Sequence, residues 1–142
     1  MNAPHRTHAR VRYGETDQMG VVYHANYIVY FELGRTEFMR AHDVHYASME
    51  QLGMRLAVVE VGVRYLRGAR YDEDLAIETR LTEASGVRVR FEYRVLRSGP
   101  TPDAPEELLA EGFTVLGCVN ADGRPTRIQQ PYKDRIIELV GR

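Results

Sequence analysis

A short stretch near the N-terminus carries residue types that could hydrolyse an activated acyl group. Asp17 lies seven residues ahead of His24, where an apolar run with helical spacing begins. The first N–H groups of a helix have no partner within it, and the helix dipole adds partial positive charge there, so they can polarise a carbonyl oxygen. A carboxylate can attack that carbonyl or deprotonate water for the attack. Asp17 and the His24 N–H are therefore candidate catalytic groups.

These residues also have ordinary structural interpretations. An aspartate ahead of a helix is often a turn or capping residue. The His24 imidazole could position Asp17 or a water, or could simply form a hydrogen bond near the helix start, whereas its backbone N–H acts independently of the side chain. Gly20 lies between the two residues and would allow a tight turn and a close approach of ligand to backbone. Glu15 is assigned a structural role.

The elements that must position this stretch are one strand, one long helix and four further strands. Five segments alternate apolar and polar residues with the period of a half-buried strand. They are residues 7–13, 59–65, 75–81, 87–95 and 108–119. A hairpin turn at Ser85 and Gly86 favours antiparallel pairing among the last four.

The long helix is expected over residues 24–41. Apolar side chains recur there every three or four positions and also fill most other directions, so we expect protein to surround this helix. Gly34 costs about 1 kcal/mol of helix stability relative to alanine, which is explained if another backbone approaches closely. A helix lying on one face of a curved sheet would bury both apolar faces, which predicts an α+β fold.

The motif and the element order resemble the 4-hydroxybenzoyl-CoA thioesterase family, particularly its subgroup with histidine at position 24. The resemblance is carried by residues 13–27, which include the pattern D-x-x-G-V-V-Y-H-x-x-Y. It continues through Arg35-Thr36-Glu37 and residues 69–73 and covers nearly the whole chain. The resemblance implies a hotdog fold, in which a five-stranded antiparallel sheet wraps around one long central helix, as a single domain over residues 1–142.

The same resemblance implies an acyl-CoA thioesterase that hydrolyses a thioester to a carboxylic acid and free coenzyme A. Asp17 would be the nucleophile or general base, and the His24 backbone N–H would polarise the thioester carbonyl. Gly20, Val21 and Tyr23 would contact the substrate. No metal is implied and no cofactor, because coenzyme A is part of the substrate.

Arginines are the expected ligands of the coenzyme A phosphates, since they form bidentate charge-assisted hydrogen bonds. Arg127 matches a family position that can contact the nucleotide, and Arg88 begins a series of arginines after the Ser85–Gly86 turn. Some family members have a basic cluster in that turn, which this chain lacks. Solvated surface arginines are the alternative interpretation.

The resemblance also implies a homodimer whose sheets join side by side, with active sites at the subunit interface, and commonly a dimer of dimers, that is, a homotetramer. Two other functions remain open. One is a hotdog hydratase or dehydratase that acts on acyl thioesters. The other is a non-catalytic module that binds an acyl thioester or a protein.

Composition excludes several other classes of protein. A formal net charge of −1, with 44% hydrophobic and 27% charged residues, argues against disorder and against a surface that binds nucleic acid. One cysteine, Cys118, excludes an internal disulfide and favours a reducing compartment, so a cytoplasmic location is expected. No apolar run is long enough for membrane insertion. The chain has no serine-hydrolase elbow, P-loop or dinucleotide fingerprint.

Overall fold

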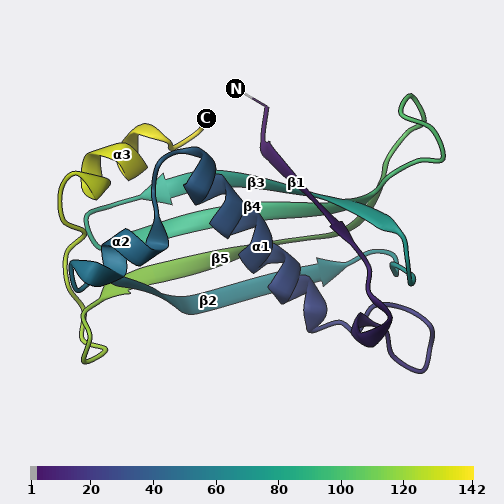
Figure 1. Ribbon diagram of the computed structural model, residues 1–142, viewed down its shortest axis with the longest axis horizontal. Helices are drawn as coiled ribbons and strands as arrows, with labels where there is room; N and C mark the ends of the chain where they lie inside the picture. Colours follow the sequence, from purple (N-terminus) through teal and green to yellow (C-terminus); the bar gives the residue numbers. More distant parts are fainter. Residues whose placement is uncertain (1–2) are drawn as a thin grey trace.

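The computed structural model describes residues 3–142 as one antiparallel sheet with a long helix on one face (Figure 1). The elements in chain order are β1 (His5–Arg10), the 3₁₀ turn η1 (Tyr13–Glu15), α1 (Asn26–Ala41), α2 (Tyr46–Gln51), β2 (Arg55–Tyr65), β3 (Asp74–Ala84), β4 (Arg88–Arg97), β5 (Glu107–Val119) and α3 (Tyr132–Glu138). The strand order is β1-β3-β4-β5-β2, and every neighbouring pair is antiparallel. The five-stranded antiparallel sheet around one long helix is therefore confirmed.

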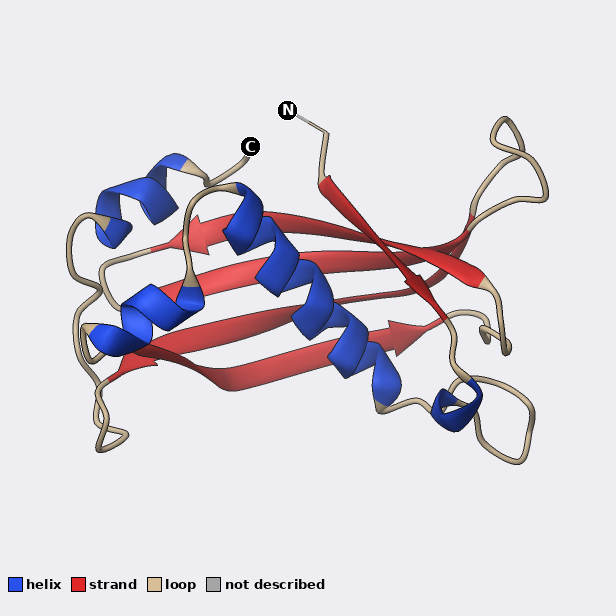
Figure 2. Ribbon diagram, viewed as in Figure 1, coloured by secondary structure: helices blue, strands red, loops and turns tan. Residues whose placement is uncertain are grey.

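Helix α1 crosses the sheet diagonally and buries one side on it (Figure 2). Phe31 is fully buried, and its ring stacks on Tyr93 of β4 with the centroids 4.5 Å apart. At Gly34 a Cβ would lie 2.5 Å from Thr79 Oγ1 and 2.7 Å from Ile77 Cγ2. A close approach at Gly34 is thus observed, but the neighbours are side chains of β3 rather than another backbone.

The predicted element boundaries on both sides of the motif differ from the structure. Strand β1 ends at Arg10, so Tyr13 lies in the 3₁₀ turn, where it is 77% exposed. Helix α1 begins at Asn26, two residues later than predicted, because His24 and Ala25 form a turn first. Shifts of this size are common at helix ends, and the turn leads directly into the helix.

The face assignment in β2 was wrong at Val59. Strict alternation over residues 59–65 predicts that this residue shares one face with Val61 and Tyr65, but the ladder to β5 has a bulge between Val58 and Glu60. An extra residue in one strand reverses the alternation on either side of it. Val58 therefore shares the inner, helix-facing side of the sheet with Val61 and Tyr65.

One flank of the molecule is left uncovered by α1. The helix packs mainly on β1, β3 and β4, while the inner face of β2 beyond the buried Leu56 stays partly open: Val58, Val61 and Tyr65 are 41–50% exposed. On the helix, Ile28 and Val29 are also exposed. The expectation that protein surrounds α1 on all sides is wrong for a single chain. We call Val58, Val61, Val63 and Tyr65 the β2 row.

Candidate functional site

A tight hairpin ahead of α1 holds Asp17 at its tip. The Tyr23 N–H donates to the Glu15 carbonyl, and the Asp17 N–H donates to the Val21 carbonyl, both at 2.9 Å. At the turn, the Gly20 N–H donates to the Asp17 carbonyl at 2.9 Å. Gly20 has φ 80°, a left-handed conformation that glycine adopts without strain. The tight turn predicted at Gly20 is therefore present.

The Asp17 carboxylate is half-buried and uses only one of its oxygens in the turn. Its Oδ1 accepts a hydrogen bond from the Met19 N–H at 2.8 Å. No donor within residues 3–142 bonds to Oδ2. Asp17 thus fills the ordinary turn role and still has one oxygen available to a water or a substrate.

His24 sits where the hairpin runs into the helix. No group in the described part of the chain accepts a hydrogen bond from its backbone N–H or bonds to its ring nitrogens. Its imidazole instead packs against Tyr23 and Tyr65, with ring centroids 4.5 and 6.2 Å away. The Tyr65 hydroxyl donates to the His24 carbonyl at 2.8 Å. The backbone N–H is therefore free, and the ring does not bond to Asp17.

Glu15 connects the hairpin to helix α1 through hydrogen bonds. Its carbonyl accepts a hydrogen bond from Asn26 Nδ2 at 2.9 Å, and its Oε1 accepts from the Tyr30 hydroxyl at 3.1 Å and from the Arg12 N–H at 2.8 Å. Burial, with the Glu15 charge adding to it, raises the pKa of Tyr30 far above its ordinary value, so Tyr30 stays protonated and donates. These contacts agree with a structural role for Glu15.

The loop between β2 and β3 contacts the other side of the hairpin through hydrogen bonds and close packing. The Val22 N–H donates to the Ala69 carbonyl at 2.8 Å, and the Ala69 N–H donates to the Tyr27 hydroxyl at 3.2 Å. Val21 lies so close to Gly68 that a Cβ there would meet Val21 Cγ1 at 2.8 Å. The position of the hairpin therefore depends on this second loop.

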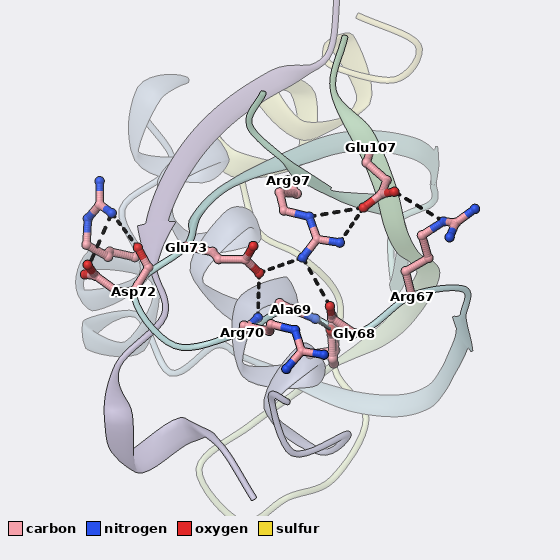
Figure 3. A network of polar contacts seen from close by, with 10 residues as sticks. Arg67, Gly68, Ala69, Arg70, Asp72, Glu73, Arg97 and Glu107 are labelled. Carbon is pink, nitrogen blue, oxygen red and sulfur yellow. Dashed lines mark hydrogen bonds and ion pairs between the residues drawn. The ribbon is translucent and has the colours of Figure 1, made fainter. Parts of the chain in front are cut away.

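A polar network anchors that loop to the sheet (Figure 3). Arg97 Nη1 donates to Glu73 Oε1 at 2.6 Å and to the Gly68 carbonyl at 3.2 Å, and Arg97 Nε donates to Glu107 Oε1 at 3.1 Å. The Arg70 N–H shares Glu73 Oε1 at 2.6 Å. Arg97 holds the pKa of Glu107 below its ordinary 4.5, so this pairing persists at neutral pH and is lost as the pH falls through the lowered value.

One chain does not bring the predicted phosphate ligands to Asp17. Strand β4 runs from Arg88 to Arg97, and only Arg97 lies beside the hairpin. Nine steps of about 3.3 Å place Arg88 about 30 Å away along the strand. Arg127 lies at that far end too, with Nη1 4.0 Å from a Cβ added at Gly86.

Sequence reasoning missed Lys133, which joins this far cluster. A Cβ at Gly86 would lie 3.7 Å from Lys133 Cε, because α3 folds back over the turn. No described carboxylate pairs with Arg88, Arg127 or Lys133, which we call the turn cations. Lys133 is the one lysine in the chain, but its spacing gave no sign of a contact with residue 86.

Other parts of the surface offer different chemistry. A hollow of about 660 Å³ lies on the opposite face of the sheet, beside Arg90 and Phe113, and its charges include the paired Arg94 and Glu78. No group of three side chains suited to a metal gathers within residues 3–142. In that same range, none of the helices combines the length and the apolar character that a bilayer crossing requires.

Comparison with known proteins gives a family match. The model of the thioesterase-like superfamily matches residues 11–136. YneP of Bacillus subtilis is 38% identical over 125 residues, covering 87% of this chain and 86% of the relative. YbgC of Escherichia coli O6:H1, named an acyl-CoA thioester hydrolase, is 35% identical over 113 residues, covering 78% of each.

Solved structures share the fold along almost the whole chain. A hypothetical protein from Thermus thermophilus superposes with a TM-score of 0.85 at 39% identity, covering 94% of this chain and 98% of that one. A DHNA-CoA thioesterase from Staphylococcus aureus superposes with a TM-score of 0.81 at 31% identity, covering 91% and 83%. The predicted hotdog fold is therefore confirmed.

Arg97→Met should loosen the hairpin through the β2–β3 loop, since it removes the bonds to Glu73, Glu107 and Gly68. We expect the Val22 amide, whose acceptor is in that loop, to exchange its hydrogen about tenfold faster. Hydrogen exchange followed by NMR measures this. Arg94→Met, which removes an ion pair on the opposite face, is the matched control, and equal exchange rates in both variants would contradict the anchoring role.

Proposed function

The chain belongs to the thioesterase-like superfamily, and we propose that within it the protein is an acyl-CoA thioesterase of the 4-hydroxybenzoyl-CoA type with histidine at position 24. The observation that carries this proposal is one hairpin that holds a carboxylate with a free oxygen, Asp17, and ends at a free backbone N–H, His24. Relatives named acyl-CoA thioester hydrolase and DHNA-CoA thioesterase support the reaction type.

The proposed mechanism has two routes that share one charge-stabilising group. Asp17 either attacks the thioester carbon, expelling coenzyme A as thiolate and leaving an anhydride that water hydrolyses, or takes a proton from the water that attacks. In both routes negative charge develops on the carbonyl oxygen, and the His24 N–H donates to it. Water is the co-reactant, and the products are a carboxylic acid and a thiol. This chemistry requires no cofactor.

The substrate would lie along the hairpin surface. Gly20 has no side chain to block approach, Val21 is half-buried against the β2–β3 loop, and Tyr23 is 48% exposed beside His24. We propose that these three residues contact the thioester and the chain that links it to coenzyme A.

The open edge of β2 supports assembly as a homodimer. The strand order leaves β1 and β2 at the edges, and β2 is the longer, with eleven residues against six. A free edge with exposed apolar side chains, here Val58 and Val59, is a template for pairing with another strand. We propose that a second copy pairs antiparallel to β2 and that two such dimers form a homotetramer.

This pairing would bring the turn cations of one subunit close to the Asp17 hairpin of the other. A twofold axis at the β2 edge reverses the direction of the second sheet. The turn cations of one subunit then lie at the same end of the joined sheet as the hairpin of the other. We propose that Arg88, Arg127 and Lys133 bind the coenzyme A phosphates of a thioester held by the neighbouring hairpin.

Asp17→Asn keeps the shape of the side chain and removes its charge. We expect kcat for acyl-CoA hydrolysis, followed by thiol release, to fall by about 10²-fold or more, because both the nucleophile and the base are lost. Asp122→Asn, in an exposed turn, should leave kcat unchanged. A folded Asp17→Asn variant with nearly wild-type turnover would refute the assignment, and turnover without thiol release would favour a hydratase.

Removing two turn cations tests the phosphate contacts. In the double variant Arg127→Met with Lys133→Met, KM for an acyl-CoA should rise about tenfold, since each charged hydrogen bond is worth about 1.5–3 kcal/mol when buried and less when exposed. The matching acyl-pantetheine ester lacks the nucleotide, so its KM should not change. Arg124→Met is the control. Equal effects on both esters would contradict the proposal.

Mass measurement in solution tests the assembly. We expect an even number of subunits for the wild type, and for Val59→Arg a dissociation constant raised at least about tenfold, because the charge is placed at the joined edge. Ile137→Arg, on exposed α3, is the matched control and should assemble normally. A wild-type protein that stays monomeric at micromolar concentration would rule out the shared site.

A further inference from the structure

Arg35 is a half-buried cation without an acidic partner. It lies on the part of α1 that faces α2, and no carboxylate within residues 3–142 pairs with it. Its hydrogen bond is from Nη1 to the Tyr93 hydroxyl at 3.3 Å. A charge taken partly out of water is costly unless it is paired. The remaining donors of the guanidinium are therefore available to an anion.

Buried hydroxyls fix where this guanidinium lies. The Tyr93 hydroxyl also bonds to Thr114 Oγ1 at 2.6 Å, and both side chains are almost fully buried on the inner face of the sheet. Burial raises the pKa of Tyr93, so it remains a neutral hydroxyl that can accept from Arg35. Thr114 is directly opposite Val61 in the β5–β2 ladder. The Arg35 head group therefore lies close to the middle of the β2 row.

Tyr65, at the C-terminal end of the β2 row, contacts His24 ahead of helix α1. Tyr65, whose hydroxyl bonds to the His24 carbonyl, is four residues from Val61 on the same face. At about 3.3 Å per residue the two are about 13 Å apart. The surface between them is apolar and partly exposed. An acyl group that starts at the His24 N–H can extend along it and end near Arg35.

The space around Arg35 is open to a ligand. Arg35 lines a hollow of about 460 Å³ between α1 and α2, together with Glu32, Met39 and Tyr46. The neighbouring Arg40 is neutralised by its ion pair with Glu37. Arg35 is thus a cation in this hollow whose charge is available to pair with an anionic ligand.

We propose that Arg35 binds a carboxylate at the far end of the acyl group, so that the substrates are acyl-CoA thioesters with an ω-carboxylate. This inference rests on the proposed thioesterase function. The thioester lies at His24, the carbon chain or ring lies on the β2 row, and the terminal carboxylate forms the paired hydrogen bonds that a guanidinium fork favours. A methyl-ended acyl group leaves Arg35 unpaired and binds less well.

The experiment compares pairs of saturated acyl-CoA thioesters of equal length, one ending in a carboxylate and the other in a methyl group, by thiol release. For the wild type, kcat/KM should favour the carboxylate by at least about tenfold once the chain spans the β2 row. Arg35→Met should abolish this preference while hydrolysing the methyl-ended ester. Arg35→Gln, which can still bond to Tyr93, should do the same, and Arg35→Lys should keep part of the preference.

Arg64→Met is the matched control, since Arg64 is an exposed arginine that pairs with Glu111 at 3.8 Å. It should keep the wild-type preference. Equal rates for both esters at every length, or an unchanged preference in Arg35→Met and Arg35→Gln, would overturn the inference. A changed subunit mass with the preference retained would assign Arg35 to a subunit contact and overturn it too. A wild type that releases no thiol from any ester would instead overturn the proposed function.

Discussion

Contacts between the Asp17 hairpin and the β2–β3 loop hold the candidate site in place. The hairpin that carries Asp17 has few residues and little core of its own, so it takes its position in part from the β2–β3 loop, through the bond from the Val22 N–H to the Ala69 carbonyl. That loop is held by Arg97, a side chain from β4 that reaches both Glu73 and Glu107. The placement of Asp17 thus depends on a series of contacts that begins at the C-terminal end of β4, the central strand of the sheet.

The packing of the sheet also underlies the proposal that two chains form one site. Helix α1 needs a close approach at Gly34 to pack on β1, β3 and β4, and in this position it leaves β2 uncovered. An uncovered strand at a sheet edge favours pairing with a second copy. The proposed acyl site between His24 and Arg35 uses the same exposed part of β2. The proposed assembly and the proposed acyl site therefore share one feature of the helix packing.

Local sequence patterns predicted most of the elements and the motif. Alternation located the strands because each is buried on one side, and Gly20 marked a turn because its conformation is local. The bulge after Val58 was missed because it depends on pairing with β5, which lies about fifty residues later. Lys133 and Tyr65 were missed for a similar reason: their contacts with Gly86 and His24 exist only after distant segments meet.

In the proposed mechanism a thioester carbonyl accepts a hydrogen bond from the His24 N–H while Asp17 acts on the carbonyl carbon or on water. Amide NMR spectra recorded during titration with a coenzyme A thioether, which keeps the carbonyl one carbon from sulfur and cannot be hydrolysed, test it most directly. We expect the His24 amide proton to move downfield and to show the largest shift, with smaller changes at Val21 and Tyr23. The largest shifts at Arg90 and Phe113, on the opposite face of the sheet, with His24 unmoved, would contradict it.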